Sequence, residues 1–193
     1  MILLFALAPA LAAPKPSPLT EEDWATLRKG EVVVRAKTTG EMVMSTGYVL
    51  VSVPPDALWP EVLDVKARIP ENSTLKAVVE YRRESPTDWY IRSDMSVFGF
   101  EVSFHNHYTF FPEDGYASYT LDESQANDLR VCDGWYVVTP MEGPGGSPER
   151  SLLVYYSSNQ VDVYAPRWVR RWMANDSMEN VLEKIRDRAE HKR

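Results

Sequence analysis

The residues best placed for chemistry lie in the segment 100–111, which reads FEVSFHNHYTFF. Because side chains of a strand point alternately to its two faces, His105 and His107 would share one face and could bind a metal ion together. Zinc sites usually need three or four protein ligands, and the only other histidine is His191, near the C-terminus. No carboxylate has a diagnostic spacing, so we expect two solvent-facing histidines and predict no metal site.

The other face of this segment combines aromatic and apolar side chains with one amide. Its members are Val102, Phe104, Asn106, Tyr108 and Phe110. This set is expected to point into the protein. The Asn106 amide then has two equally acceptable roles, binding the polar end of a ligand or pairing with backbone groups in the core.

Motifs that position a nucleophile or a phosphate group are missing from the sequence. There is no G-x-S-x-G, and three histidines leave little room for a Ser-His-Asp arrangement. The glycine-rich run 143–146 precedes a predicted strand and not a helix, so it is expected to be a turn. We therefore predict no catalytic residue and no cofactor, although tyrosine or acidic groups in a dry pocket could still transfer protons.

Composition and charge exclude several classes of protein. The 193 residues are 44% hydrophobic and 25% charged, as in a soluble globular domain, and the formal net charge is −7. No basic stripe dominates, so a nucleic-acid partner is not expected. The single cysteine, Cys132, cannot form an intramolecular disulfide and is expected to be a buried apolar side chain.

The N-terminal residues 1–30 form two parts. Residues 1–13 hold an apolar run of signal-peptide length that ends in Ala-rich cleavage patterns, although no Lys or Arg precedes it. Export to a bacterial periplasm or beyond is expected, and a retained N-terminal membrane anchor is the alternative. Residues 14–30 form a Pro-rich leader and a short helix, with Thr20 as its cap and Gly30 at its end.

The domain at 31–193 is expected to be α+β. Segments 31–37 and 42–53 read as a hairpin or one bent strand, and two short helices follow within 55–70. Breakers then separate six further strands at about 74–84, 88–97, 100–111, 116–123, 130–139 and 150–163. Short connections of this kind indicate an antiparallel meander, which a final helix from Pro166 to about Glu190 is left to cover.

The final helical segment contains two apolar clusters on nearly opposite sides. The first comprises Trp168, Val169, Trp172 and Met173, and the second Ala174, Met178, Val181, Leu182, Ile185 and Ala189. Either the helix breaks at residues 175–177, or it stays straight. In the straight form Trp168 and Trp172, with Arg167 and Arg171, would face a membrane, a partner or a ligand. Packing of both tryptophans around Trp24 is the alternative.

The segment 51–72, VSVPPDALWPEVLDVKARIPEN, resembles the START-like superfamily, also called SRPBCC or helix-grip. The similarity lies in a strand, a Pro pair, a Trp-containing helix, Asp64, a short helix and Pro70, and the resemblance extends over about 42–190. It implies a curved antiparallel sheet of about seven strands and a long C-terminal helix across its concave face. The additional strand at 31–37 departs from this pattern.

The resemblance also implies a cavity between sheet and helix that holds an apolar or lipid-like molecule. The candidate lining residues are Trp89, Met95, Phe104, Asn106, Tyr108, Tyr119, Trp135, Tyr156, Gln160, Met178 and Leu182. In strand 150–163 the alternative set, with Tyr155 and Ser157, offers similar chemistry. The expected function is binding, or binding and transfer, of a hydrophobic small molecule. A cyclase/dehydrase-type enzyme and a membrane-associated protein with a vestigial pocket are the alternatives.

Overall fold

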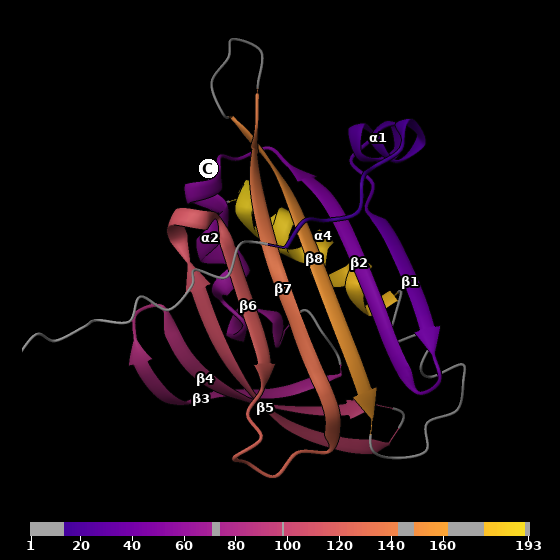
Figure 1. The fold of residues 1–193 in the computed structure, drawn as a ribbon. Coiled ribbons are helices and arrows are strands. Elements are labelled where there is room, and N and C mark those ends of the chain that lie inside the picture. The colour runs from indigo at the N-terminus through magenta and orange to yellow at the C-terminus, as the bar shows by residue number, and fades with distance from the viewer. Residues whose placement is uncertain (1–13, 71–73, 98, 143–148, 162–175, 192–193) are drawn as a thin grey trace, which may run out of the picture.

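The computed structural model describes residues 14–70, 74–97, 99–142, 149–161 and 176–191 (Figure 1). In chain order the elements are α1 (Glu21–Arg28), β1 (Val33–Thr39), β2 (Met42–Val51), α2 (Pro55–Leu63), the 3₁₀ turn η1 (Lys66–Arg68), β3 (Leu75–Ser85), β4 (Asp88–Val97), β5 (Phe100–Phe111), the 3₁₀ turn η2 (Pro112–Asp114), β6 (Tyr116–Leu121), β7 (Leu129–Met141), β8 (Arg150–Val161) and α4 (Asp176–His191).

All eight strands belong to one antiparallel sheet with the order β1-β2-β8-β7-β6-β5-β4-β3. Strands β3 to β8 follow one another as a meander, as the short connections predicted. The segment around Gly40 forms the turn of a β1–β2 hairpin, with Gly40 at a φ of 61°. A hairpin thus replaces the alternative of one bent strand, and β1 makes the sheet eight strands wide where about seven were expected.

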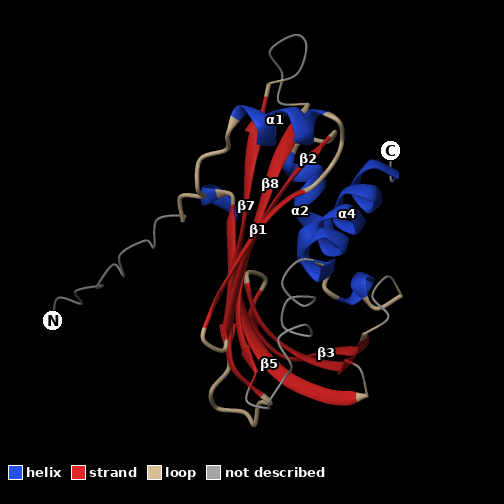
Figure 2. Cartoon of the chain, turned by 90° about the vertical axis from the view of Figure 1, so that its right-hand side faces the viewer, coloured by secondary structure: helices blue, strands red, loops and turns tan. Residues whose placement is uncertain are grey.

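The sheet curves strongly, and α2 and α4 lie on its concave side (Figure 2). Helix α4 packs against β2, β1 and α2, while α2 also reaches β7 and β8. Met178, Leu182, Ile185 and Ala189 form the buried stripe of α4 and are four of the six members of the second apolar cluster predicted for this segment; Val181 is partly buried, and Ala174 lies outside the described residues. The helix-grip arrangement expected from the resemblance is therefore confirmed.

A smaller apolar cluster lies on the convex face of the sheet. Leu27 of α1 packs there with Tyr48, Tyr116, Val137 and Val154. Local sequence explains the helix, since Thr20 and Asp23 form a reciprocal capping box at its start. The leader is fixed to the same face, because the Tyr48 hydroxyl donates to the carbonyl of Ser17 at 3.1 Å.

Two expectations concern residues outside the described parts. The apolar segment 1–13 is one of them, and the group Arg167, Trp168, Arg171 and Trp172 is the other. Helix α4 begins at Asp176, within the three residues where a break was considered, but the segment before it is not described. Among the described helices, none combines the length and apolarity that crossing a membrane requires.

Candidate ligand-binding site

The concave face of the sheet carries most of the predicted lining residues. On it lie Trp89, Met95, Phe104, Asn106, Tyr108 and Tyr119 from the sheet, and Met178 and Leu182 of α4 belong to the same core cluster, where they pack over Gly47 of β2. The interior is markedly aromatic, since Trp89 stacks on Tyr108 with ring centroids 5.7 Å apart. Contact of these residues with a ligand remains a prediction.

Three predicted lining residues lie on the opposite face. Trp135 stacks on Tyr156 there, 5.4 Å between centroids, and both pack near the α1 cluster. Gln160 is in phase with Tyr156 and donates to the Glu41 carboxylate at 3.5 Å. The choice of phase in β8 was therefore wrong, and the alternative set, with Tyr155 and Ser157, faces the interior.

Asn106 is a structural amide. Its Nδ2 group donates to the carbonyls of Thr120, at 3.2 Å, and Cys132, at 3.0 Å. Its Oδ1 accepts from the Cys132 thiol at 3.7 Å. Burial raises the pKa of that thiol to about 12, so Cys132 stays protonated and unreactive. Of the two roles considered for Asn106, pairing with the backbone is the one observed.

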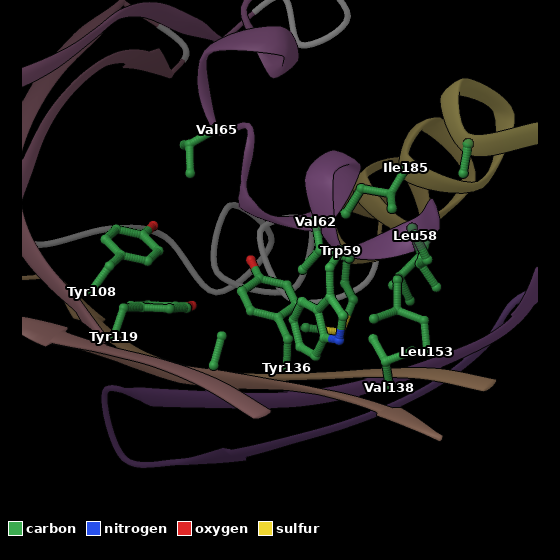
Figure 3. Packing of buried hydrophobic residues seen from close by; sticks show 14 of the residues in the cluster. Leu58, Trp59, Val62, Val65, Tyr108, Tyr119, Tyr136, Val138, Leu153 and Ile185 are labelled. Carbon is green, nitrogen blue, oxygen red and sulfur yellow. The ribbon is translucent and has the colours of Figure 1, made fainter. Parts of the chain in front are cut away.

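Four tyrosines form a continuous aromatic group on the concave face. The ring centroids of Tyr108 and Tyr119 lie 5.2 Å apart, and those of Tyr119 and Tyr136 lie 6.2 Å apart. The ring of Tyr136 stacks on that of Tyr155, with 4.4 Å between the centroids. Figure 3 shows Tyr108, Tyr119 and Tyr136 on the side of the sheet that faces Val62 and Val65. Burial raises the pKa values of Tyr108, Tyr119 and Tyr155, so these hydroxyls are neutral donors.

Arg68, at the end of η1, extends a guanidinium into this aromatic group. The residue is 9% exposed, and its carbon Cζ lies over the Tyr136 ring, 5.6 Å from the centroid. Nη1 donates to the Tyr136 hydroxyl at 3.1 Å, and Nη2 donates to the carbonyl of Val62 at 2.8 Å. Its Nε is buried and has no hydrogen-bond partner among the residues that the structure describes.

Arg68 is not among the site residues predicted from the sequence, although the sequence holds a signal for it. Side chains at i and i+3 eclipse one another in a 3₁₀ turn, so Arg68 shares a face with Val65, the residue just before η1. Val65 is only 7% exposed and belongs to the main core cluster. An arginine three residues after an apolar core residue in a short helical turn is the sequence pattern that indicates the burial of Arg68.

A pocket of about 240 Å³ opens between the α2–η1 segment and strands β3 and β4. Core side chains of Val65, Trp89 and Ile91 line it together with a charged group. The charged group consists of Asp64, Lys66, Glu80 and Arg83. An apolar wall with a charged border suits an amphipathic ligand more than a purely apolar one.

The two strand histidines have separate partners on the convex side. His107 Nε2 lies 2.7 Å from Asp88 Oδ1, and its ring stacks on Tyr90 at 4.2 Å. His105 Nδ1 lies 3.3 Å from Asn127 Oδ1. Within the described ranges, no three His, Cys, Asp or Glu side chains are grouped as metal ligands would be.

Comparison with known proteins supports the fold and not a particular activity. No family model matches the sequence, and no curated protein matches it. Solved structures do match. A STAR-related lipid transfer protein fragment from Xanthomonas axonopodis has a TM-score of 0.66 at 12% identity, over 82% of this chain and 93% of its own.

Two further structures represent different named functions. Human StAR-related lipid transfer protein 5 has a TM-score of 0.64 at 13% identity, over 83% of each chain. The Zhui aromatase/cyclase from Streptomyces sp. R1128 has a TM-score of 0.52 at 18% identity, over 77% of this chain and 87% of its own. The chain therefore has the START-like, helix-grip fold, which is a fold of proteins named for lipid transfer and for cyclisation.

Proposed function

We propose that this protein binds an apolar or lipid-like small molecule between the α2–η1 segment and strands β3 and β4, where Trp89 continues into the aromatic concave face of β5 and β6. The observation that carries the proposal is the pocket bordered by Val65, Trp89 and Ile91, because its wall is part of the main core. Its volume of about 240 Å³ suits a single ring or one end of an alkyl chain.

The arrangement of the helices agrees with this placement. Helices α2 and α4 pack over the part of the sheet formed by β1, β2, β8 and β7. The aromatic side chains of β4, β5 and β6 lie beyond that part, where Trp89, Tyr108 and Tyr119 offer flat apolar surfaces. The lipid-transfer names of two similar structures support the same class of ligand.

The test has two parts. Protein purified without detergent is extracted with organic solvent, and mass spectrometry looks for a stoichiometric apolar molecule. The extracted protein is then titrated with N-phenyl-1-naphthylamine, a neutral fluorescent probe. We expect saturable binding, which Val65→Trp weakens by filling the pocket, whereas Val79→Trp, at a position 51% exposed, leaves binding unchanged.

The outcome that contradicts the proposal is equally plain. If no apolar molecule is extracted and the probe does not bind saturably, the proposal is contradicted. A melting curve for each variant separates loss of binding from loss of folding.

We also propose that the protein is exported. The support is the apolar run within residues 1–13 and the Ala-rich patterns that end it. Mass spectrometry of the protein expressed in a bacterial host checks the proposal. A mature N-terminus near Pro14 is expected, and an intact Met1 in the membrane fraction would favour the anchor.

A further inference from the structure

Arg68 is a buried cation whose hydrogen-bond partners among the described residues are both neutral oxygen atoms. A guanidinium has five N–H donors, and here one reaches the Tyr136 hydroxyl and one the Val62 carbonyl. Three donors are left over, and the Nε among them is shielded from water. No ion pair joins Arg68 to a carboxylate of the described residues.

Other arginines of the chain show how a counter-ion is normally supplied. Arg188, whose side chain is 14% exposed, lies 3.2 Å from a Glu61 carboxylate oxygen. Arg35, which lies 5.5 Å from the centroid of Tyr48 much as Arg68 does over Tyr136, has Asp23 at 2.5 Å. Burying a charge without a counter-ion is costly, and no described carboxylate supplies one to Arg68.

The surroundings of Arg68 favour an anion. Hydroxyl groups of neutral tyrosines can donate to it: the Tyr136 ring lies against the guanidinium, and Tyr108 and Tyr155 are close enough to interact with its charge. The two carboxylates that line the pocket have other partners, since Glu80 accepts from Arg83 at 2.6 Å and 2.8 Å and Asp64 accepts from the Ala67 N–H at 3.0 Å. Thus neither carboxylate is directed at Arg68.

We propose that the ligand of this protein is an amphiphile with an anionic headgroup, a carboxylate or a phosphate, and that Arg68 binds this headgroup. The inference rests on the proposed function, because it names the polar end of the same ligand. The planar guanidinium suits either anion, since both accept two parallel N–H bonds. The apolar part of the ligand would lie along the aromatic side chains of β4–β6.

The experiment compares three ligands that share one alkyl chain. Decanoate, decyl phosphate and 1-decanol are titrated at pH 7.4 into the solvent-extracted protein, by displacement of N-phenyl-1-naphthylamine. At least one anion should bind about tenfold or more tightly than 1-decanol, because a hydrogen-bonded charge contributes that much. The preference between the two anions identifies the headgroup.

Variants assign the preference to Arg68. In Arg68→Gln and Arg68→Met the anion should bind no more tightly than 1-decanol, while the affinity for 1-decanol stays within about twofold. The matched control is Arg35→Gln, which removes an arginine that lies over a tyrosine ring on the convex face and should keep the preference. Melting curves of both Arg68 variants verify that each is folded, and having two of them guards against one that is not.

Each outcome bears on one of the two proposals. Equal binding of all three ligands to the unmodified protein would overturn the anionic headgroup and leave the apolar site standing. A preference that survives in both Arg68 variants would overturn the role of Arg68. If the probe does not bind, so that no ligand can displace it, the proposed function itself fails.

Discussion

Tyr119 on β6 and Tyr155 on β8 bring their hydroxyl oxygens within 2.9 Å of each other across the strand that separates them. Gly134 of β7 is the residue between, paired with Tyr119 on one side and Ser157 on the other. A Cβ at this position would collide with the Tyr119 ring. The missing side chain therefore lets one tyrosine lie flat on the sheet and reach the second.

Gly134→Ala is expected to destabilise the protein by about 1–3 kcal/mol, because the added methyl group must displace a buried ring that its hydroxyl partners hold. Urea denaturation followed by tryptophan fluorescence measures the change. Gly47→Ala is the comparison, since its Cβ would meet side-chain atoms of Leu182 and Met178, which can rotate. A cost at Gly134 no larger than that at Gly47 would contradict this account.

Removing the Tyr119 hydroxyl should cost about 1 kcal/mol of unfolding free energy, because the Tyr155 hydroxyl loses its partner in the core, while Ser157 still accepts from the Asn159 amide at 2.6 Å. Tyr156→Phe provides a matched control: the same atom is removed, but from the convex face. We expect less than about 0.5 kcal/mol there. Equal effects in the two variants would mean that the hydroxyl chain does not stabilise the fold.

The positions of the strands were predictable because their breakers are local. Pro, Gly and Asn-Asp signals determined the starts and ends of β3 to β8, and each expected strand has its observed counterpart within a few residues. The inward phase of β5 was also predictable, since one face carries Phe104, Tyr108 and Phe110 and the other two histidines. Such contrasts can be detected from sequence alone.

The phase of β8 and the role of Arg68 were not predictable in the same way. Both faces of β8 carry a tyrosine and an amide, so alternation alone does not predict which face points inward. The inward face is determined by the pairing of Ser157 with Gly134 and of Tyr155 with Tyr136. Arg68 lies in a segment with charged Asp64 and Lys66. Its burial depends on how η1 meets the Tyr136 ring from β7, which is a contact between residues far apart in the sequence.

Asp122 should stabilise the protein only above acid pH. Burial alone would raise the pKa of its carboxyl, but hydrogen bonds from Ser124 and from the Tyr81 hydroxyl, at 2.6 Å, lower it below its ordinary value. A lowered pKa gives stability that is fully present above the unfolded-state value of about 4 and is lost as pH falls through the folded-state value.

Tyr81→Phe therefore destabilises more at pH 7 than at pH 2, where protonation of the carboxyl weakens its bond with the Tyr81 hydroxyl. Urea midpoints at the two pH values measure the difference, and an NMR titration should find the pKa of Asp122 raised toward its ordinary value. In an Asp122→Asn background the effect of Tyr81→Phe should no longer depend on pH. A pH dependence that persists in that background would assign it to another group.

The α1 helix should behave as part of the domain and not as a detachable leader. Leu27 is 1% exposed in the convex cluster, so Leu27→Ala is expected to cost about 2–5 kcal/mol through lost burial and the cavity left behind. Glu22→Ala, on the exposed side of the same helix, should change stability by less than about 0.5 kcal/mol. Equal, small effects would show that α1 docks only weakly.

The Glu61–Arg188 pair should hold α4 against α2. Arg188 Nε lies 3.2 Å from Glu61 Oε2, with exposures of only 14% and 6% for the two side chains, and Nη2 donates to the Glu61 carbonyl at 3.1 Å. Glu61→Ala removes this carboxylate from beside a mostly buried guanidinium, which should cost about 3–5 kcal/mol.

The surface pair Arg82–Glu84 supplies the control. These side chains are 45% and 53% exposed, so Glu84→Ala should cost no more than about 1 kcal/mol. Denaturant unfolding gives both values, and hydrogen exchange should detect faster opening of α4 in Glu61→Ala alone. Unchanged protection of α4 in that variant would show that the apolar stripe of Met178, Leu182 and Ile185 holds the helix without the ion pair.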